Sequence, residues 1–205
     1  MTLPAFNRLV TAGLALAIAL ATPALLPTTA RAAPQAFEID PEHFSIGFRA
    51  NHIGYGDVLG MFLKAEGGFT YDAETDAISD LRIAIAADSV FTNHDRRDRH
   101  LRGSDFLNAG EFPEIVFTGT GAEKTGENTG LIHGELELLG VTRPVTVEVT
   151  LNKAADYPFG HKKYTLGISA DTTVKRSEFG MTYAVEGGLV GDSIDLFFEF
   201  EALAQ

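Results

Sequence analysis

The sequence contains no cysteine and no tryptophan, and it is poor in basic residues. Without cysteine, thiol catalysis is excluded and disulfides cannot stabilise the fold, so stability must come from a sizeable hydrophobic core. Lys and Arg number 16 against 28 Asp and Glu, a formal net charge of -12. Because nucleic-acid partners require clustered Lys and Arg, we expect no nucleic-acid partner. The 205 residues fit one larger all-β domain better than two small domains.

No apolar run is long enough for a membrane-spanning helix, which needs about 20 continuous apolar residues. The longest run, residues 14–26, follows Arg8 and is interrupted by Pro23. It is followed by Ala-Arg-Ala at residues 30–32, a small-residue cleavage signal. This order of features is typical of a secretory signal peptide, with an uncleaved N-terminal anchor as the alternative.

We therefore expect residues 1–32 to be a signal peptide and residues 33–205 to form a single domain. Cleavage removes two Arg and no acidic residue, so the formal charge of -12 becomes -14. The expected product is an acidic periplasmic protein that does not span the membrane after cleavage. Its oligomeric state is left open, a homodimer included.

Hydrophobic residues alternate with polar ones from Phe37 onward, the pattern of strands with one buried face. Turn-rich segments at residues 72–76 and 140–144 separate such runs and predict hairpins. Pro144 can only begin a strand or lie at an edge, because it lacks a backbone N–H. About eight strands follow, in a sandwich or a barrel. The predicted strands are residues 44–50, 59–71, 78–87, 114–120, 130–138, 145–152, 164–174 and 193–203.

Residues 93–108 break this alternation, being rich in Arg, Asp and His. They predict a short helix. Leu101 would share a face with Asp98 and Asp105, not with a wide apolar stripe, so the helix should lie on the surface or across a barrel end.

Some predicted strands are small or apolar on both faces, as where Ile83 and Ile85 alternate with Ala84 and Ala86. A sheet with two apolar faces has two apolar environments to satisfy. A barrel with a ligand inside meets this requirement, and so does a two-layer sandwich or a sheet covered by a helix. Periodicity alone leaves these alternatives open.

A series of short motifs extends over nearly the whole expected mature chain, residues 37 to about 201. In their order and spacing they resemble the YceI-like family of lipocalin-like, polyisoprenoid-binding periplasmic proteins. Phe44, Leu107 and the absence of a Trp in the first strand depart from the family pattern. The motifs are IDPEH at residues 39–43 with the strand 44–48, His52, GMF at 60–62, SVFTN at 89–93, RDRHL at 97–101, SDF at 104–106, FPEIVF at 112–117, residues 134–145 ending in GVTRPV, and RSEFGM at 176–181.

The resemblance implies an all-β, antiparallel, lipocalin-like barrel of about eight strands with one short helix across or beside an end. It also implies a long isoprenoid or quinone-like lipid in the interior. Strand parity then predicts the inward, ligand-binding side chains, and a register slip of one residue would reverse the set. These are Ile46, Phe48, Ile83, Ile85, Phe117, Val147, Val149, Leu166, Ile168, Leu196 and Phe198.

Arg97 and His100 lie in the non-strand segment and are candidate contacts for a lipid head group. The alternative is a structural role, in which charge-assisted hydrogen bonds fix the helix over the barrel mouth.

The six histidines contain no H-x-x-x-H pair, so we expect no metal and no cofactor. A surface metal site around His94 and His100, with Asp95 and Asp98 between them, is the alternative. The histidines are at residues 43, 52, 94, 100, 133 and 161.

The sequence has no G-x-S-x-G nucleophile elbow. Glu135 and Glu137 share a face of one strand, where carboxylates are usually solvated. We therefore expect no enzyme but a protein that carries or sequesters an apolar lipid. Two rivals remain: an interaction or stress-response protein whose filled barrel acts through its acidic surface, and a small-molecule enzyme.

Overall fold

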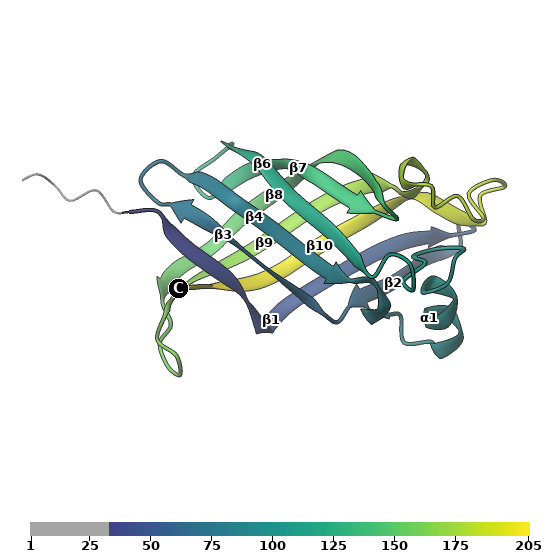
Figure 1. Cartoon of the computed structure of the whole chain (residues 1–205), viewed down its shortest axis with the longest axis horizontal. Helices are drawn as coiled ribbons and strands as arrows, with labels where there is room; N and C mark the ends of the chain where they lie inside the picture. The colour runs from purple at the N-terminus through teal and green to yellow at the C-terminus, as the bar shows by residue number, and fades with distance from the viewer. Residues whose placement is uncertain (1–32) are drawn as a thin grey trace, which may run out of the picture. The chain divides into compact units, whose positions relative to one another are not determined.

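The computed structural model describes residues 33–205, which form one ten-stranded antiparallel sheet with little helix (Figure 1). The helical elements are α1 (Asp95–Leu101) and two 3₁₀ turns, η1 (Ala87–Ser89) and η2 (Arg176–Phe179). The expected signal peptide lies outside the described residues. The strands are β1 (Gln35–His52), β2 (Gly56–Phe62), β3 (Ala65–Asp72), β4 (Ala77–Ala86), β5 (Val90–Phe91), β6 (Glu114–Lys124), β7 (Thr129–Leu138), β8 (Val141–Asp156), β9 (Tyr164–Lys175) and β10 (Val190–Ala204).

Eight of these strands close into a barrel, which confirms the predicted fold class. The strand order is β10-β9-β8-β7-β6-β4-β3-β1, and an additional pairing of β10 with β1 closes the circle. β2 and β5 extend the sheet beyond the second half of β1. Closure gives nearly every strand a hydrogen-bonded neighbour on both sides, so the barrel has few exposed edges.

The barrel has two ends of different construction (Figure 1). The α1 end carries the β1–β2 hairpin, α1, the β7–β8 turn and the segment from η2 to β10. The opposite end, here called the terminal end, carries the β3–β4, β6–β7 and β8–β9 connections and the C-terminus. In the described part of the chain, no helix is long and apolar enough to cross a membrane.

The predicted boundaries of the first two strands, residues 44–50 and 59–71, were wrong. The predicted strand 59–71 is two strands, because the chain breaks at Leu63 and Lys64, whose backbone N–H groups donate to the Ser89 hydroxyl at 3.1 and 3.2 Å. The first strand begins at Gln35, well before residue 44, and accommodates Pro41 in an irregularity of its pairing with β10. Proline is tolerated in a strand at such a bulge, where its missing N–H breaks no ladder bond.

The predicted loop at residues 140–144 was also wrong. Leu139 and Gly140 alone make the turn, with φ of 55° and 70°, and β8 resumes at Val141. Positive φ at both central residues is the type I′ geometry that matches the twist of a tight hairpin. Pro144 lies where β8 pairs with β7 only, since the pairing of β8 with β9 begins at Glu148. It therefore occupies an edge, as its missing N–H requires.

Helix α1 lies at a barrel end, as predicted, and is anchored through Thr92. His94 caps the helix by accepting the Arg97 N–H at 3.2 Å. The buried Asp98 carboxylate accepts the Thr92 N–H at 2.9 Å and also its hydroxyl. Arg97 donates to the Thr92 carbonyl and hydroxyl oxygens, both at 2.7 Å. These bonds hold a seven-residue helix that is too short to be stable by itself.

Arg176 organises the long connection between β9 and β10. It is 2% exposed, and its guanidinium donates to the carbonyls of Met181, Val190 and Gly191 at 2.8–3.0 Å. Gly180 follows η2 with φ of 85°, a left-handed conformation that glycine adopts at little cost. This buried side chain thus ties three points of the connection together, and the Ser177 N–H and hydroxyl add bonds to Asp192 at 2.9 and 2.8 Å.

We predict that Arg176→Met lowers the free energy of unfolding by about 2 to 4 kcal/mol, because three carbonyls lose a charged donor while the side-chain volume is largely kept. Urea denaturation followed by circular dichroism measures this change. The matched control is Arg82→Met: Arg82 pairs with Glu114 at 3.3 Å, both side chains are 51% exposed, and the loss should stay below about 1 kcal/mol. Equal losses for the two variants would contradict the assigned role of Arg176.

Candidate functional site

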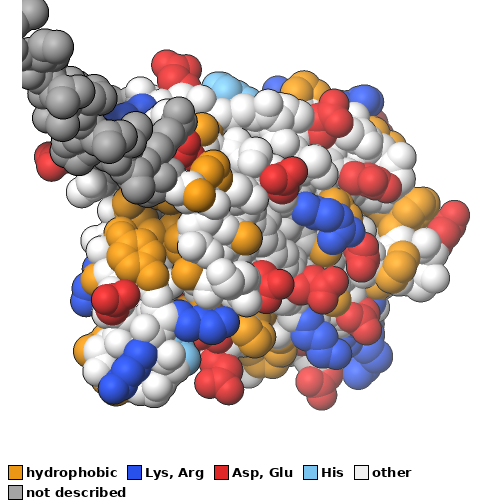
Figure 2. Space-filling model, turned by 60° about the vertical axis from the view of Figure 1, so that its left-hand side comes forward, with side chains coloured by type: hydrophobic (Ala, Val, Ile, Leu, Met, Phe, Trp, Pro, Cys, Tyr) orange, Lys and Arg blue, Asp and Glu red, His pale blue; other side chains and the backbone are white. Residues whose placement is uncertain are grey.

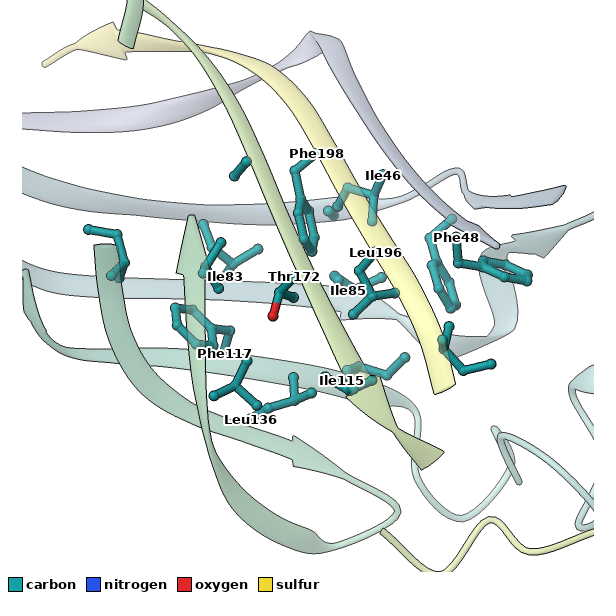
Figure 3. Close-up of a pocket in the computed structure, with 18 of the residues that line it drawn as sticks. Ile46, Phe48, Ile83, Ile85, Ile115, Phe117, Leu136, Thr172, Leu196 and Phe198 are labelled. Carbon is teal, nitrogen blue, oxygen red and sulfur yellow. The ribbon is translucent and has the colours of Figure 1, made fainter. Parts of the chain in front are cut away.

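The barrel encloses an apolar cavity of about 650 Å³. Its wall is built from the inward faces of all eight barrel strands, and Figure 3 shows side chains from several of them directed into one space. Small-molecule sites in proteins typically have volumes of about 300 to 1,000 Å³. The interior is therefore hollow on the scale of a ligand, not filled by its own side chains.

All eleven side chains predicted to face inward line this cavity. That they contact a bound molecule stays a prediction. The predicted set lacks other wall residues, among them Ile115, Leu136, Ala170 and Thr172. Ile115 shares the face of Phe117 and Leu136 is apolar at the expected parity, so the same alternation would have found them.

Glycines keep the cavity open despite the phenylalanines in its wall. The Phe48 ring lies over Gly60 on β2, and the Phe117 ring over Gly134 on β7, so that a Cβ at either glycine would overlap the ring. Each ring can therefore lie against the neighbouring strand instead of projecting into the interior. Aromatic rings covering glycines in adjacent strands are a known stabilising arrangement in sheets.

Thr172 is a polar residue in the middle of the wall, and its hydroxyl is already bonded. It donates to the Thr146 carbonyl on β8 at 2.9 Å, and Figure 3 places its side chain among the apolar ones. Because this hydroxyl has a partner, the central wall imposes no hydrogen-bonding requirement on a molecule inside.

Three aromatic rings cluster at the α1 end of the cavity. His100, Phe106 and Tyr183 meet edge to face, with centroids 5.0–5.2 Å apart. Tyr183 is 46% exposed and also lines the cavity, as do the exposed Ile53 and Leu189. The cavity therefore reaches the surface between apolar side chains of the β1–β2 hairpin and the β9–β10 connection.

Arg97 and His100 line the cavity at this end, and both already have protein partners. Arg97 bonds to Thr92, and His100 Nε2 lies 2.8 Å from an Asp105 carboxylate oxygen. These contacts support the structural alternative for both residues. Contact with a head group stays a prediction.

The terminal end of the cavity is polar. Lys124 donates to Asp76 at 2.7 Å, and the Tyr71 hydroxyl donates to the same carboxylate at 2.9 Å. Burial, followed by the hydrogen bond to Asp76, raises the pKa of Tyr71 to about 12. The two ends thus differ chemically: exposed apolar side chains accompany Arg97 and His100 at the α1 end, whereas an ion-paired network lies at the terminal end.

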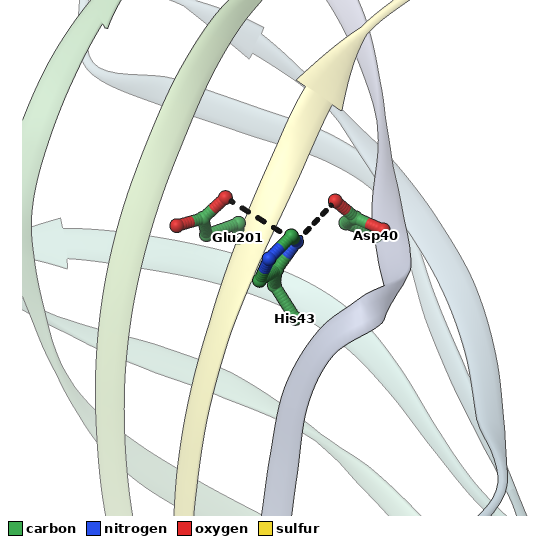
Figure 4. A group of neighbouring side chains, drawn as sticks. All are labelled: Asp40, His43 and Glu201. Atoms are coloured by element: carbon green, nitrogen blue, oxygen red, sulfur yellow. Dashed lines mark hydrogen bonds and ion pairs between the residues drawn. The ribbon is translucent and has the colours of Figure 1, made fainter. Parts of the chain in front are cut away.

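A second group of polar side chains lies where β1 meets β10 (Figure 4). His43 Nδ1 is 2.8 Å from Asp40 Oδ2 and 3.8 Å from Glu201 Oε2. The hydrogen bond with Asp40 raises the pKa of His43 above its ordinary value. Burial alone would raise the pKa of Asp40, but hydrogen bonds from His43 and the Glu42 N–H hold it below its ordinary value. Sequence reasoning missed this group, because Glu201 lies at the opposite end of the chain.

The other polar groups considered from the sequence do not assemble into sites. Within residues 33–205, Asp40, His43 and Glu201 are the one group of three potential metal ligands whose donor atoms all lie within 4.8 Å of one another. The alternative metal site around His94 and His100 does not form such a group, since His94 caps α1 and His100 bonds to Asp105. Glu135 and Glu137 are exposed. Figure 2 shows acidic and basic side chains interspersed on one face of the molecule.

A family model described as YceI-like domain matches residues 37–202, most of the chain. Among curated proteins, Protein YceI of Salmonella arizonae is 36% identical over 183 residues, which covers 88% of this chain and 93% of the relative. The family resemblance drawn from the motifs is thereby confirmed.

Solved structures agree with this relationship. The YceI protein of Campylobacter jejuni is 26% identical, with a TM-score of 0.67 over 76% of this chain and 90% of that one. BcnA of Burkholderia cenocepacia has a TM-score of 0.69 at 18% identity, covering 80% and 98% of the two chains. A domain from Saccharophagus degradans described as polyisoprenoid binding has a TM-score of 0.61 at 14% identity, covering 83% and 99%. At these last two identities the likeness concerns the fold.

We predict that Gly60→Ala reduces the affinity of the purified protein for the apolar dye N-phenyl-1-naphthylamine by about threefold or more. The added methyl overlaps the Phe48 ring. Because the wall around this ring is closely packed, the ring can move only toward the cavity. Fluorescence titration measures the affinity. Gly121→Ala in β6 is the control, since no atom lies within 4 Å of its added Cβ. Unchanged dye affinity in Gly60→Ala would show that the position of the Phe48 ring does not limit the space available to a ligand.

Proposed function

The chain belongs to the YceI-like family, and on this premise we propose that it binds a long isoprenoid chain in its barrel and carries or sequesters it without catalysing a reaction. The observation that carries the proposal is the apolar cavity of about 650 Å³. A domain of the same fold is described as polyisoprenoid binding, which supports this choice of ligand over other apolar molecules.

The energetics of burial favour a long hydrocarbon. Each methylene group buried contributes about 0.8 kcal/mol, so one five-carbon unit offers roughly 3 to 4 kcal/mol before the entropy of confinement. Association costs an estimated 4 to 15 kcal/mol, and micromolar affinity requires about 8 kcal/mol net. Several units are therefore enough without a strong polar contact, in keeping with a wall whose central hydroxyl, that of Thr172, already has a partner.

The hollow interior speaks against the rival with a filled barrel. That hypothesis needs the inward side chains to pack against one another across the barrel, whereas Phe48 and Phe117 lie against glycines of the next strand. The small-molecule enzyme is disfavoured because the described cavity wall is mainly apolar between its two ends and the carboxylates considered from the sequence, Glu135 and Glu137, are solvent-exposed.

The α1 end is the entrance we assign to the ligand. Exposed apolar side chains, Ile53, Tyr183 and Leu189, surround the cavity there, whereas the terminal end has the Lys124–Asp76 ion pair. An isoprenoid tail can enter past apolar side chains without desolvating a charge. The head group then lies near Arg97 and His100, where it affects selectivity more than affinity.

We predict that organic extraction of the protein purified from its host, followed by mass spectrometry, yields a polyprenyl compound, and that Ala170→Trp lowers its yield at least about tenfold. Ala170 is 6% exposed and lines the cavity, so an indole there occupies the space of the ligand.

The matched control is Asp171→Trp, which introduces the same residue one position further along β9, on its exposed outer face. Its lipid yield should equal that of the unaltered protein. The proposal would be overturned if the wild-type protein is purified without lipid and takes up no added polyprenol. An equal loss of lipid yield in both variants would show that the lipid does not bind in the cavity.

We further propose that the protein works in the periplasm after removal of residues 1–32. The support is the signal-peptide pattern around Arg8 and residues 30–32. Intact-mass measurement of the periplasmic fraction should give a chain beginning at Ala33. Recovery of a membrane-bound chain that still begins at Met1 would favour the uncleaved anchor.

A further inference from the structure

The irregularity in the β1–β10 pairing brings together a carboxylate, an imidazole and a second carboxylate. Ile39 pairs with Ala202 and Phe44 with Phe200, so the four residues 40–43 stand opposite the single residue Glu201. The extra residues bend β1 so that Asp40 and His43 both face Glu201 (Figure 4). The arrangement exists only because the first and last strands of the barrel are neighbours.

One of the oxygen atoms in this group lacks a hydrogen bond. Among the described residues, Glu201 Oε2 is buried and has no hydrogen-bond partner, although the Glu201 side chain as a whole is 31% exposed, and the imidazole Nδ1 of His43 lies 3.8 Å away. Buried polar atoms are nearly always paired, and each exception requires an explanation. An ionised oxygen is especially costly to leave unpaired, and a bound cation satisfies it.

The spacing of the donor atoms fits a small divalent ion. Tetrahedral zinc binds nitrogen and oxygen at about 2.0 to 2.2 Å, which places its ligands roughly 3.3 to 3.5 Å apart. The two measured separations from His43 Nδ1, 2.8 Å to Asp40 and 3.8 Å to Glu201, lie on either side of this value. The third pair, the carboxylate oxygens of Asp40 and Glu201, also lies within 4.8 Å. Side-chain shifts of about an ångström therefore bring all three atoms to ligand distance.

We propose that Asp40, His43 and Glu201 form a binding site for a divalent transition-metal ion of the zinc class. An imidazole nitrogen with carboxylate oxygens suits zinc and its neighbours, whereas calcium and magnesium prefer oxygen ligands alone. The His43 side chain is 48% exposed, so water can complete the coordination. On binding, the metal takes the place of the Nδ1 proton that now lies between His43 and Asp40, and that proton passes to solvent.

Such an ion would clamp the closing pair of the barrel. Asp40 and His43 belong to β1 and Glu201 to β10, the two strands whose pairing closes the sheet. A ligand that binds the native state alone stabilises it in proportion to its concentration over the dissociation constant. Bound metal therefore stabilises the pairing of β1 with β10 that closes the barrel, whether or not the cavity holds a lipid.

The test is isothermal titration of ZnCl₂ into purified protein that carries no histidine tag and has been stripped with a chelator. We expect saturable 1:1 binding, weakened at least about tenfold in both His43→Ala and Glu201→Gln, which corresponds to about 1.4 kcal/mol. Glu201→Gln keeps the side-chain shape, and the thermal midpoint of each apo variant verifies folding. Zinc should raise the midpoint of the wild type and not that of the variants.

The matched control is His133→Ala. His133 is exposed to a similar extent as His43, 45% against 48%, and it has a single carboxylate neighbour, Glu123, at 3.9 Å. This variant should bind zinc like the wild type. Titration with Co²⁺ adds a visible absorption band that reports the ligand geometry and that both site variants should lose. Absence of saturable binding, or zinc affinity unchanged in His43→Ala and Glu201→Gln, would overturn the proposal.

Discussion

The pairing of β1 with β10 is the constraint on which the rest of this structure depends. It joins the two ends of the described chain, so the sheet needs no covering layer to protect its edges. A closed sheet satisfies its backbone groups within the wall, and the interior is then free of polar backbone that would require water. Only under this condition can an apolar space of about 650 Å³ persist inside a small protein.

The cavity stays open because of the sizes of the side chains in its wall. A cavity lined by large residues would normally collapse or be filled, because protein interiors pack as densely as organic crystals. Here Phe48 and Phe117 satisfy their packing against Gly60 and Gly134 in the wall itself. The protein thus obtains a core without cysteine crosslinks, and these two rings lie against the wall of the cavity. The same arrangement allows the barrel to be stable and hollow at once.

The two ends of the barrel differ in the side chains that they carry. At the α1 end, Arg176 and the bonds between α1 and Thr92 hold the β9–β10 connection and the helix beside an apolar opening. Toward the terminal end, polar groups dominate, including the Lys124–Asp76 pair and the group of Asp40, His43 and Glu201 at the barrel seam. The proposed lipid entrance and the proposed metal site therefore involve different residues, which allows each to be tested without disturbing the other.

The sequence by itself determined which side chains share a face of each strand, because the alternation along a strand is a local property of the extended backbone, and the structure shows which of the two faces lines the cavity. Ile46, Phe117 and Leu196 were placed correctly in the cavity wall for this reason, and the motifs identified the family. Turn geometry was less accessible: Leu139 adopts a positive φ that no propensity rule favours, so the loop at residues 140–144 was wrong. Only the tertiary structure decided that the interior is hollow and that Glu201 meets His43. Both depend on which strands become neighbours, and strand pairing joins residues far apart in the chain through contacts that no local pattern encodes.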